Sequence, residues 1–202
     1  MEYPSKLIED AVNQVAKLPG IGKKTALRLV LHLIKEKEES TFSLTDALNN
    51  LRSKIRFCSS CHNISDAEVC GICSSPRRDR GLLCVVEDTK DVMAIENTAQ
   101  FNGLYHVLGG VISPVNGIGP SDIRIESLLN RIRLNQPEIR EIILALSPTM
   151  EGDTTAFYIN KRLHDVAIKI SVIARGVPVG GDLEYTDEIT LGRSITGRTL
   201  FG

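Results

Sequence analysis

The stretch that constrains this chain most tightly is Cys58-Ser-Ser-Cys61, eight further residues and then Cys70-Gly-Ile-Cys73. Two C-x-x-C turns at this spacing are typical of a site in which four thiolates hold one zinc ion tetrahedrally. Four protein sulfurs leave no coordination position for water or substrate, so the predicted zinc is structural. The stretch therefore predicts a four-cysteine zinc finger over residues 57–77.

Other interpretations of these cysteines, such as disulfides, have less support from the sequence. Residues 1–24 are charged and amphipathic, without the continuous apolar core of a signal peptide, so we expect a cytoplasmic protein. Cytosolic chains rarely keep disulfides. His62 follows Cys61 directly and is an alternative ligand, but the four cysteines suffice. Cys84 lies in an apolar run and is expected to be a buried strand residue.

The composition is that of a globular protein with one large or two small domains. The chain has 202 residues, of which 42% are hydrophobic and 24% charged. Tryptophan is absent and aromatics make up 4%, which argues against an aromatic platform for stacking bases. No apolar run approaches the roughly 18 residues of a membrane span, so we expect no membrane partner. The formal net charge is −1, with basic residues in excess before residue 80 and acidic residues in excess after it, which suggests different partners for the two halves.

Apolar residues at helical spacing predict three helices in the first 57 residues. The three sets are Leu7, Ile8, Ala11, Val12 and Val15; Ala26, Leu29, Val30, Leu33 and Ile34; and Leu44, Ala47, Leu48, Leu51 and Ile55. Ser43 is the expected N-cap of the third helix. Residues 74–80 are predicted to form a polar connector.

From Gly81 onward, strands and helices alternate. The predicted strands are 82–86, 104–107, 139–146 and 170–173, and the predicted helices are 89–97, 124–135 and 154–167. Apolar strands separated by helices predict a parallel sheet covered on both faces. A Gly-rich C-terminal segment follows, with a short helix expected near 187–192. The fold class is therefore an α+β chain of several parts.

The first candidate functional motif runs from Leu18 to Leu29, with the sequence LPGIGKKTALRL. Gly20 and Gly22 permit positive φ and close approach of another backbone. A helix is expected to begin at about Gly22, and its free N–H groups are suited to binding a phosphate. The positions available to neutralise neighbouring phosphates are Lys23, Lys24 and Arg28.

The motif is a helix–hairpin–helix and not a nucleotide-binding P-loop. A P-loop requires G-x-x-x-x-G-K-[ST] after a strand, whereas Lys17 stands five positions before Gly22 and Lys24 follows Gly22-Lys23. A helix–hairpin–helix grips DNA phosphates without reading sequence. A turn that only joins two core helices, or that serves packing or dimerisation, remains the alternative.

The second candidate is acidic. Glu87 and Asp88 end the first strand of the α/β part, and Glu151-Gly-Asp153 follows a later strand. Ligands of open parallel sheets gather at the carboxyl ends of the strands, so Glu87, Glu151 and Asp153 are expected to converge there as oxygen ligands for Mg²⁺. Such a cluster suits metal-assisted phosphoryl transfer. The alternative is that Asp88 and Asp153 cap the following helices.

The third candidate spans residues 177–188, where an apolar stretch runs into acids in a Walker B-like manner. Without a Walker A partner this is a poor nucleotide site, and we expect an ordered tail or a subunit contact instead.

These parts, in this order, resemble the bacterial RecR family of recombination mediators from end to end. The resemblance rests on the hairpin at 18–29, the four cysteines, the α/β segment and the tail GGDLEYTDEITLGRSITGR at 180–198. It implies a helical domain over 1–56, a zinc finger over 57–77, a Toprim-like α/β domain over 80–175 and a C-terminal segment over 176–202. In the family this last segment is described as Walker B-like and contributes to subunit contact.

The resemblance also implies a function. Family members are regarded as lacking catalysis, form ring-shaped tetramers that clamp DNA, and act with RecO, and in many bacteria RecF, to help load RecA onto single-stranded DNA. Lys23, Lys24 and Arg28 would line the DNA-contacting face. Glu87, Glu151 and Asp153 would occupy the Toprim acidic positions. That pattern usually has a Glu and then D-x-D, so Glu151-Gly-Asp153 weakens the case for metal catalysis.

The sequence thus predicts a non-enzymatic, nucleoid-associated DNA-repair clamp that binds DNA independently of sequence. Its acidic edge would serve Mg²⁺ or a basic partner such as RecO. The alternative is a Mg²⁺-dependent Toprim nuclease or strand-transferase. Against it, no convincing tyrosine nucleophile is found, since Tyr105 lies in a predicted strand and Tyr158 in a predicted helix.

Overall fold

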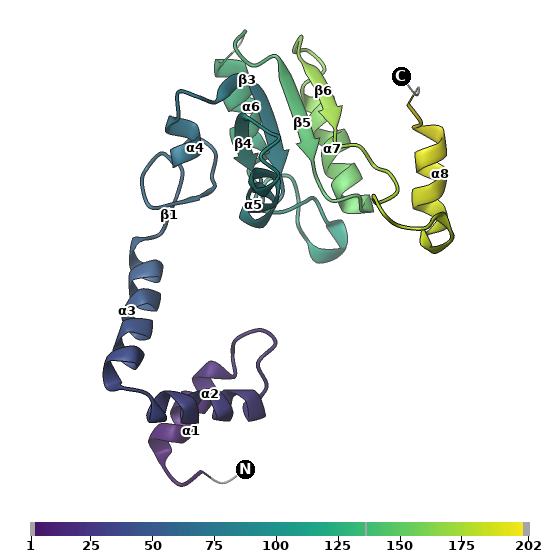
Figure 1. Cartoon of the computed structure of the whole chain (residues 1–202). Coiled ribbons are helices and arrows are strands. Elements are labelled where there is room, and N and C mark those ends of the chain that lie inside the picture. The colour runs from purple at the N-terminus through teal and green to yellow at the C-terminus, as the bar shows by residue number, and fades with distance from the viewer. Residues whose placement is uncertain (1–2, 136, 200–202) are drawn as a thin grey trace. The chain divides into compact units, whose positions relative to one another are not determined.

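The computed structural model describes residues 3–135 and 137–199 of the chain (Figure 1). The chain divides into two compact units, Met1–Ile55 and Arg56–Gly202. Within the described residues, no helix combines the length and the apolarity that crossing a membrane requires.

The first unit consists of three helices, as the sequence predicts: α1 (Lys6–Val15), α2 (Lys23–Lys35) and α3 (Glu38–Lys54). α1 and α2 pack through a small buried cluster of Val12, Ala26 and Val30. The turn between them closes with a hydrogen bond from the Ile21 amide to the Leu18 carbonyl at 3.1 Å. Gly20 in this turn has a φ of 78°, a conformation that costs a residue with a Cβ far more than it costs glycine.

The expected N-cap of the third helix is wrong. α3 begins at Glu38, and Ser43 lies inside it. Glu38 and Glu39 in its first turn interact favourably with the positive end of the helix dipole and extend the helix N-terminally beyond its apolar face. The apolar pattern from Leu44 onward therefore marks one face of the helix and not its start.

The second unit begins with the zinc-finger segment. It comprises β1 (Arg56–Phe57) and β2 (Ile64–Ser65), which pair antiparallel, and the one-turn helix α4 (Gly71–Ser74).

A four-stranded sheet follows, in the order β4-β3-β5-β6 with every pair parallel (Figure 1). Its strands are β3 (Asp79–Val86), β4 (Gly103–Val107), β5 (Glu141–Ala145) and β6 (Lys169–Val172). The connector predicted over 74–80 ends earlier, because Asp79 already starts β3.

Helices cover both faces of the sheet, as predicted. One face packs against α6 (Ile125–Leu134) and α7 (Met150–Arg162), and the core there includes Leu83, Val85 and Ile142. The other face packs against α5 (Thr89–Asn97), around Cys84 and Val86. Burial on both faces explains why the strands appear as continuous apolar runs. The chain continues through η1 (Pro114–Asn116) between β4 and α6, and through η2 (Leu183–Tyr185) and α8 (Glu188–Thr196) after β6.

The start of α7 differs from the predicted helix over 154–167. The helix begins at Met150, capped by the Thr149 hydroxyl, which accepts from the Gly152 amide at 3.2 Å. Glu151 and Asp153 therefore lie in its first turn and not in the loop before it. This start depends on Gly152, because a Cβ there would collide with the backbone carbonyl of Ser147.

Replacing Gly152 by alanine should consequently destabilise the second unit. We expect a loss of about 1–3 kcal/mol in the free energy of unfolding, as for other overpacked sites, measured by urea denaturation. Gly192→Ala is the matched control, since Gly192 lies within α8 and a Cβ there meets nothing within 4 Å. The control should not lose stability. Equal stability of the two variants would contradict the close approach of Ser147.

Candidate functional site

The four cysteines of the zinc finger meet as the sequence predicts. Their sulfur atoms all lie within 4.8 Å of one another, and all four side chains are buried. Two backbone amides point at sulfur, from Cys70 to Cys58 Sγ at 3.3 Å and from Cys73 to Cys70 Sγ at 3.5 Å. Amide donors stabilise thiolates, so the donor set fits a structural zinc ion. The ion would supply cross-linking and no open position for chemistry.

The electrostatics favour the deprotonated form of one ligand. The hydrogen bond from the Cys61 side chain holds the pKa of Cys73 at about 5, and the positive charge of Arg131 adds to this effect. His62 is not needed as a ligand, since its Nε2 lies 2.6 Å from Ser127 Oγ and its ring packs edge-on against His106. Among the described residues, the four cysteines form the only group of three or more metal-ligating side chains close enough to share an ion.

The zinc finger covers the edge of the sheet at β4. The Val107 amide donates to the Cys61 carbonyl at 2.8 Å, and Arg131 Nη1 donates to the Tyr105 carbonyl at 2.6 Å. β4 is a terminal strand of the sheet, so these contacts satisfy backbone groups that an exposed edge would offer to another chain. The sequence carries no signal for this arrangement, nor for the role of Arg131.

Zinc removal should therefore expose this edge. We expect one zinc per chain by elemental analysis, loss of the metal in Cys73→Ser, and faster amide exchange at Val107 in that variant. Cys84→Ala is the control, because Cys84 is a buried thiol in β3, separate from the cluster. A Cys73→Ser protein that keeps both its zinc and the protection of Val107 would refute the assignment.

The hairpin residues gather at the N-terminal end of α2. Gly22 is the N-cap and carries no capping side chain, and the first intrahelical bond runs from Ala26 to Gly22. Within the described residues, the amides of Lys23, Lys24 and Thr25 have no acceptor. A Cβ on Gly20 or Gly22 would meet nothing within 4 Å, so the turn is open to another molecule.

The cations of this helix are not neutralised within the chain. In the described parts, Lys23, Lys24 and Arg28 form no salt bridge, and α2 contains no acidic residue. The helix end thus combines free N–H groups with uncompensated positive charge, the combination that binds phosphate. Lys23, Lys24 and Arg28 stay proposed DNA contacts, and the geometry is suited to that role.

The acidic residues at the ends of the strands have different contacts from one another. Glu87 follows β3, and its carboxylate accepts a hydrogen bond from Ser147 Oγ at 3.0 Å. Asp88 caps α5 in a capping box with Asp91, in agreement with the alternative interpretation of that residue. Asp153 does not cap α7, whose N-cap is Thr149.

Asp153 is paired with two arginines that follow β6. Arg175 Nη2 lies 2.5 Å from one carboxylate oxygen, and Arg193 Nη2 of α8 lies 3.7 Å from the other. The hydrogen bond from Arg175 lowers the pKa of Asp153. Because guanidinium groups occupy this carboxylate, and the three acids do not form a group close enough to share an ion, the residues present do not fit Mg²⁺ in this arrangement. The sequence offers no signal for this pairing.

These ion pairs should hold the segment after β6 against the α/β domain. Arg175→Met/Arg193→Met is expected to raise amide exchange in α8 by a few-fold, because partly exposed ion pairs contribute about 0.2–1 kcal/mol each. Arg198→Met is the control, since among the described residues this arginine forms no salt bridge and its side chain donates to the Ile195 carbonyl. Asp153 has a lowered pKa, so the protection should be complete above the ordinary pKa of an aspartate and be lost as the pH falls through the lowered one. Unchanged exchange in the double variant would contradict this role.

Comparison with known families covers nearly the whole chain. Family models match residues 8–52 (RecR, helix-hairpin-helix), 55–75 (RecR, zinc finger domain with four cysteines), 81–174 (Toprim domain) and 176–199 (RecR, C-terminal). The Toprim match includes Glu87, Glu151 and Asp153.

Similar proteins extend over the same length. Recombination protein RecR of Cytophaga hutchinsonii is 62% identical over 201 residues, which cover 100% of this chain and 98% of that protein. Recombination protein RecR of Amoebophilus asiaticus is 60% identical, with 100% of both chains covered. That of Flavobacterium johnsoniae is 59% identical, covering 100% of this chain and 97% of its own. Four matching parts in one order and this identity over the full length show that the chain belongs to the RecR family.

Proposed function

We propose that this chain is a DNA-binding recombination mediator of recombinational DNA repair, without catalytic activity of its own. The observation that carries the proposal is the N-terminal end of α2, where an open glycine turn is followed by free amides and by Lys23, Lys24 and Arg28, which have no acidic partner among the described residues. Phosphate contacts of this kind hold DNA independently of its sequence. The names of the relatives, all Recombination protein RecR, support the same process.

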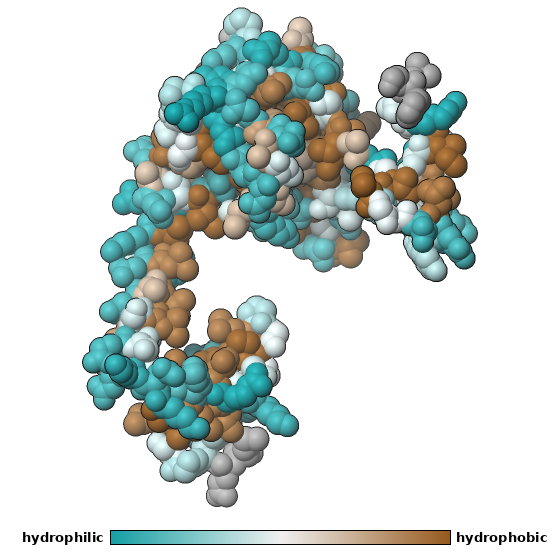
Figure 2. Space-filling view, in the orientation of Figure 1, coloured by the Kyte–Doolittle hydropathy of each residue, from teal (hydrophilic) through white to brown (hydrophobic). Residues whose placement is uncertain are grey.

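A homo-oligomeric ring, as the family resemblance implies, agrees with the apolar surface of the first unit. No residue of α3 is buried, and apolar side chains gather along this helix (Figure 2). Phe42, Leu48 and Leu51 are each about 60% exposed. A contiguous apolar surface of this kind on a protein marks an interaction site, and a second copy of the unit is the occupant that the proposed tetramer supplies.

A ring also explains how a chain with a net charge of −1 retains DNA. Each copy contributes only a few cations, but copies that face the same strand act together, and enclosure raises the effective concentration of DNA. In the proposed sequence of events, the clamp acts with RecO, and in many bacteria RecF, to load RecA onto single-stranded DNA. Glu87 and Glu151 at the acidic edge are the proposed contacts for a basic partner such as RecO.

The test is an incubation of the zinc-loaded protein with end-labelled gapped duplex and Mg²⁺, resolved on a native and on a denaturing gel. We expect a salt-sensitive shift with intact strands. Lys23→Ala/Lys24→Ala/Arg28→Ala should weaken the shift and reduce the slope of log K against log salt by up to about 2.7, because each lost phosphate contact on duplex contributes about 0.9.

The matched control removes three cations from elsewhere in the same unit, Lys37, Arg52 and Lys54, and should retain binding. Equal weakening in the two triple variants would contradict the assignment of the contact to α2. New Mg²⁺-dependent fragments that are absent with Glu87→Gln would instead support the nuclease or strand-transferase alternative.

A further inference from the structure

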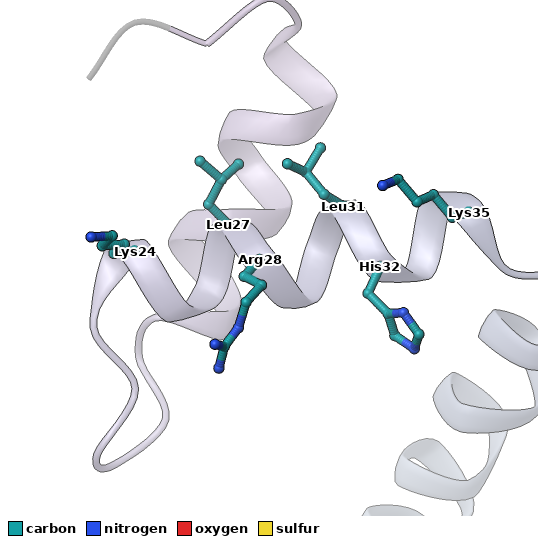
Figure 3. A pocket seen from close by; sticks show the side chains of 6 residues that line it. All are labelled: Lys24, Leu27, Arg28, Leu31, His32 and Lys35. Atoms are coloured by element: carbon teal, nitrogen blue, oxygen red, sulfur yellow. The ribbon is translucent and has the colours of Figure 1, made fainter.

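The cationic surface of α2 continues well beyond the residues at its N-terminal end. A hollow of about 380 Å³ runs along the helix and is lined by Lys24, Leu27, Arg28, Leu31, His32 and Lys35 (Figure 3). We call these six residues the α2 track. Leu27 and Leu31 lie on one side of the helix and Arg28 and His32 on the other, with the two lysines at its ends (Figure 3).

We infer that the α2 track binds a single DNA strand, with phosphates along its cations and sugars and bases against its leucines. This inference rests on the proposed function and names the form of DNA that the helix holds. From Lys24 to Lys35 the track covers 11 helical steps, or about 16 Å at roughly 1.5 Å per step. About five phosphates fit that length at the roughly 3.4 Å spacing of a stacked strand.

Charge along the track favours a polyanion over an apolar peptide. In the described residues, Lys24, Arg28 and Lys35 have no acidic partner, and the one carboxylate close to a track residue is that of Glu36, 3.9 Å from His32 Nε2. Cations therefore recur at both ends and in the middle of the hollow, at intervals that follow the helical turn.

The two leucines favour a single strand over a duplex. Leu31 is 41% exposed, and Leu27 is only partly buried against the α1–α2 core. A duplex presents charged phosphates on its outside and keeps its bases stacked, so it offers these side chains little apolar surface. A single strand exposes sugars and base faces beside each phosphate, and an apolar surface between cations matches that pattern. No Phe, Tyr or Trp lines the track, so the contact is expected to be independent of sequence.

The experiment measures binding of the full-length, zinc-loaded protein to a fluorescent oligothymidylate and to a duplex of equal length, by anisotropy over a range of salt concentrations. Lys35→Ala should reduce the single-strand salt slope by about 0.7 and the affinity by about five-fold at about 0.1 M salt. Leu31→Asn should reduce single-strand affinity by roughly five-fold without changing the salt slope, and leave duplex affinity unchanged.

Two controls make the test specific. The first is Leu29→Asn, the same chemical change on the same helix. Leu29 is 38% exposed, similar to Leu31, but lies outside the track. The second is Arg52→Ala, which removes one cation from α3. Neither should affect single-strand affinity as the track variants do. Size-exclusion chromatography and circular dichroism of each variant establish that assembly and helix content are retained.

The outcomes separate this inference from the proposed function. If Leu31→Asn and Lys35→Ala bind the single strand like their controls while the Lys23/Lys24/Arg28 triple variant is impaired, the track is refuted and the hairpin contact stands. If Leu31→Asn weakens single strand and duplex equally, the preference for a single strand is wrong. If the triple variant also binds normally, the DNA contact of α2 itself fails.

Discussion

β4 lies at the edge of the parallel sheet, and the amide of Val107 in its last position donates to the carbonyl of Cys61 in the zinc finger. The geometry of that carbonyl depends on the turn that the cysteines form, and four buried thiols without a metal have little else to hold them together. The same finger reaches α6 through His62 and Ser127, while Arg131 of α6 returns to the Tyr105 carbonyl of β4. The zinc finger thus connects the edge strand β4 to α6. It therefore stabilises the α/β domain as well as its own fold.

At the acidic edge, arginines of the chain itself compensate the charge of one of the acids at the Toprim positions. At the place where the family pattern has a second acidic pair, this chain has Glu151 and Asp153, and two arginines neutralise Asp153. A guanidinium group is a fixed, bidentate cation that belongs to the chain, so the local charge is balanced without recruiting an ion from solution. Ion pairing of Asp153 therefore supports a role in positioning the C-terminal segment. Of the three acids at the Toprim positions, Glu87 and Glu151 form no salt bridge among the described residues.

The sequence predicts those features that depend on short-range patterns. Cysteine spacing predicts the metal cluster, apolar periodicity predicts the parallel sheet and most helices, and the glycine turn predicts where α2 begins. The errors arise where a helix extends past its apolar face, as at Ser43, or where a close backbone approach sets its start, as at Gly152. Contacts such as Val107 with Cys61 and Asp153 with Arg175 join residues 46 and 22 positions apart. Their pairing is determined by tertiary packing, which leaves no local mark in the sequence.

The distribution of charge on α2 bears on how a mediator releases DNA as well as how it binds it. A long, aromatic-lined groove would hold a single strand tightly through stacking and would compete with the protein to be loaded. Leucines and scattered cations would give a weaker, salt-sensitive contact per copy, and in the proposed ring enclosure by several copies would supply the residence time instead. When such a ring opens, the effective concentration is lost at once and each remaining contact is weak. A track of this composition therefore suits a protein that must retain a strand and then transfer it.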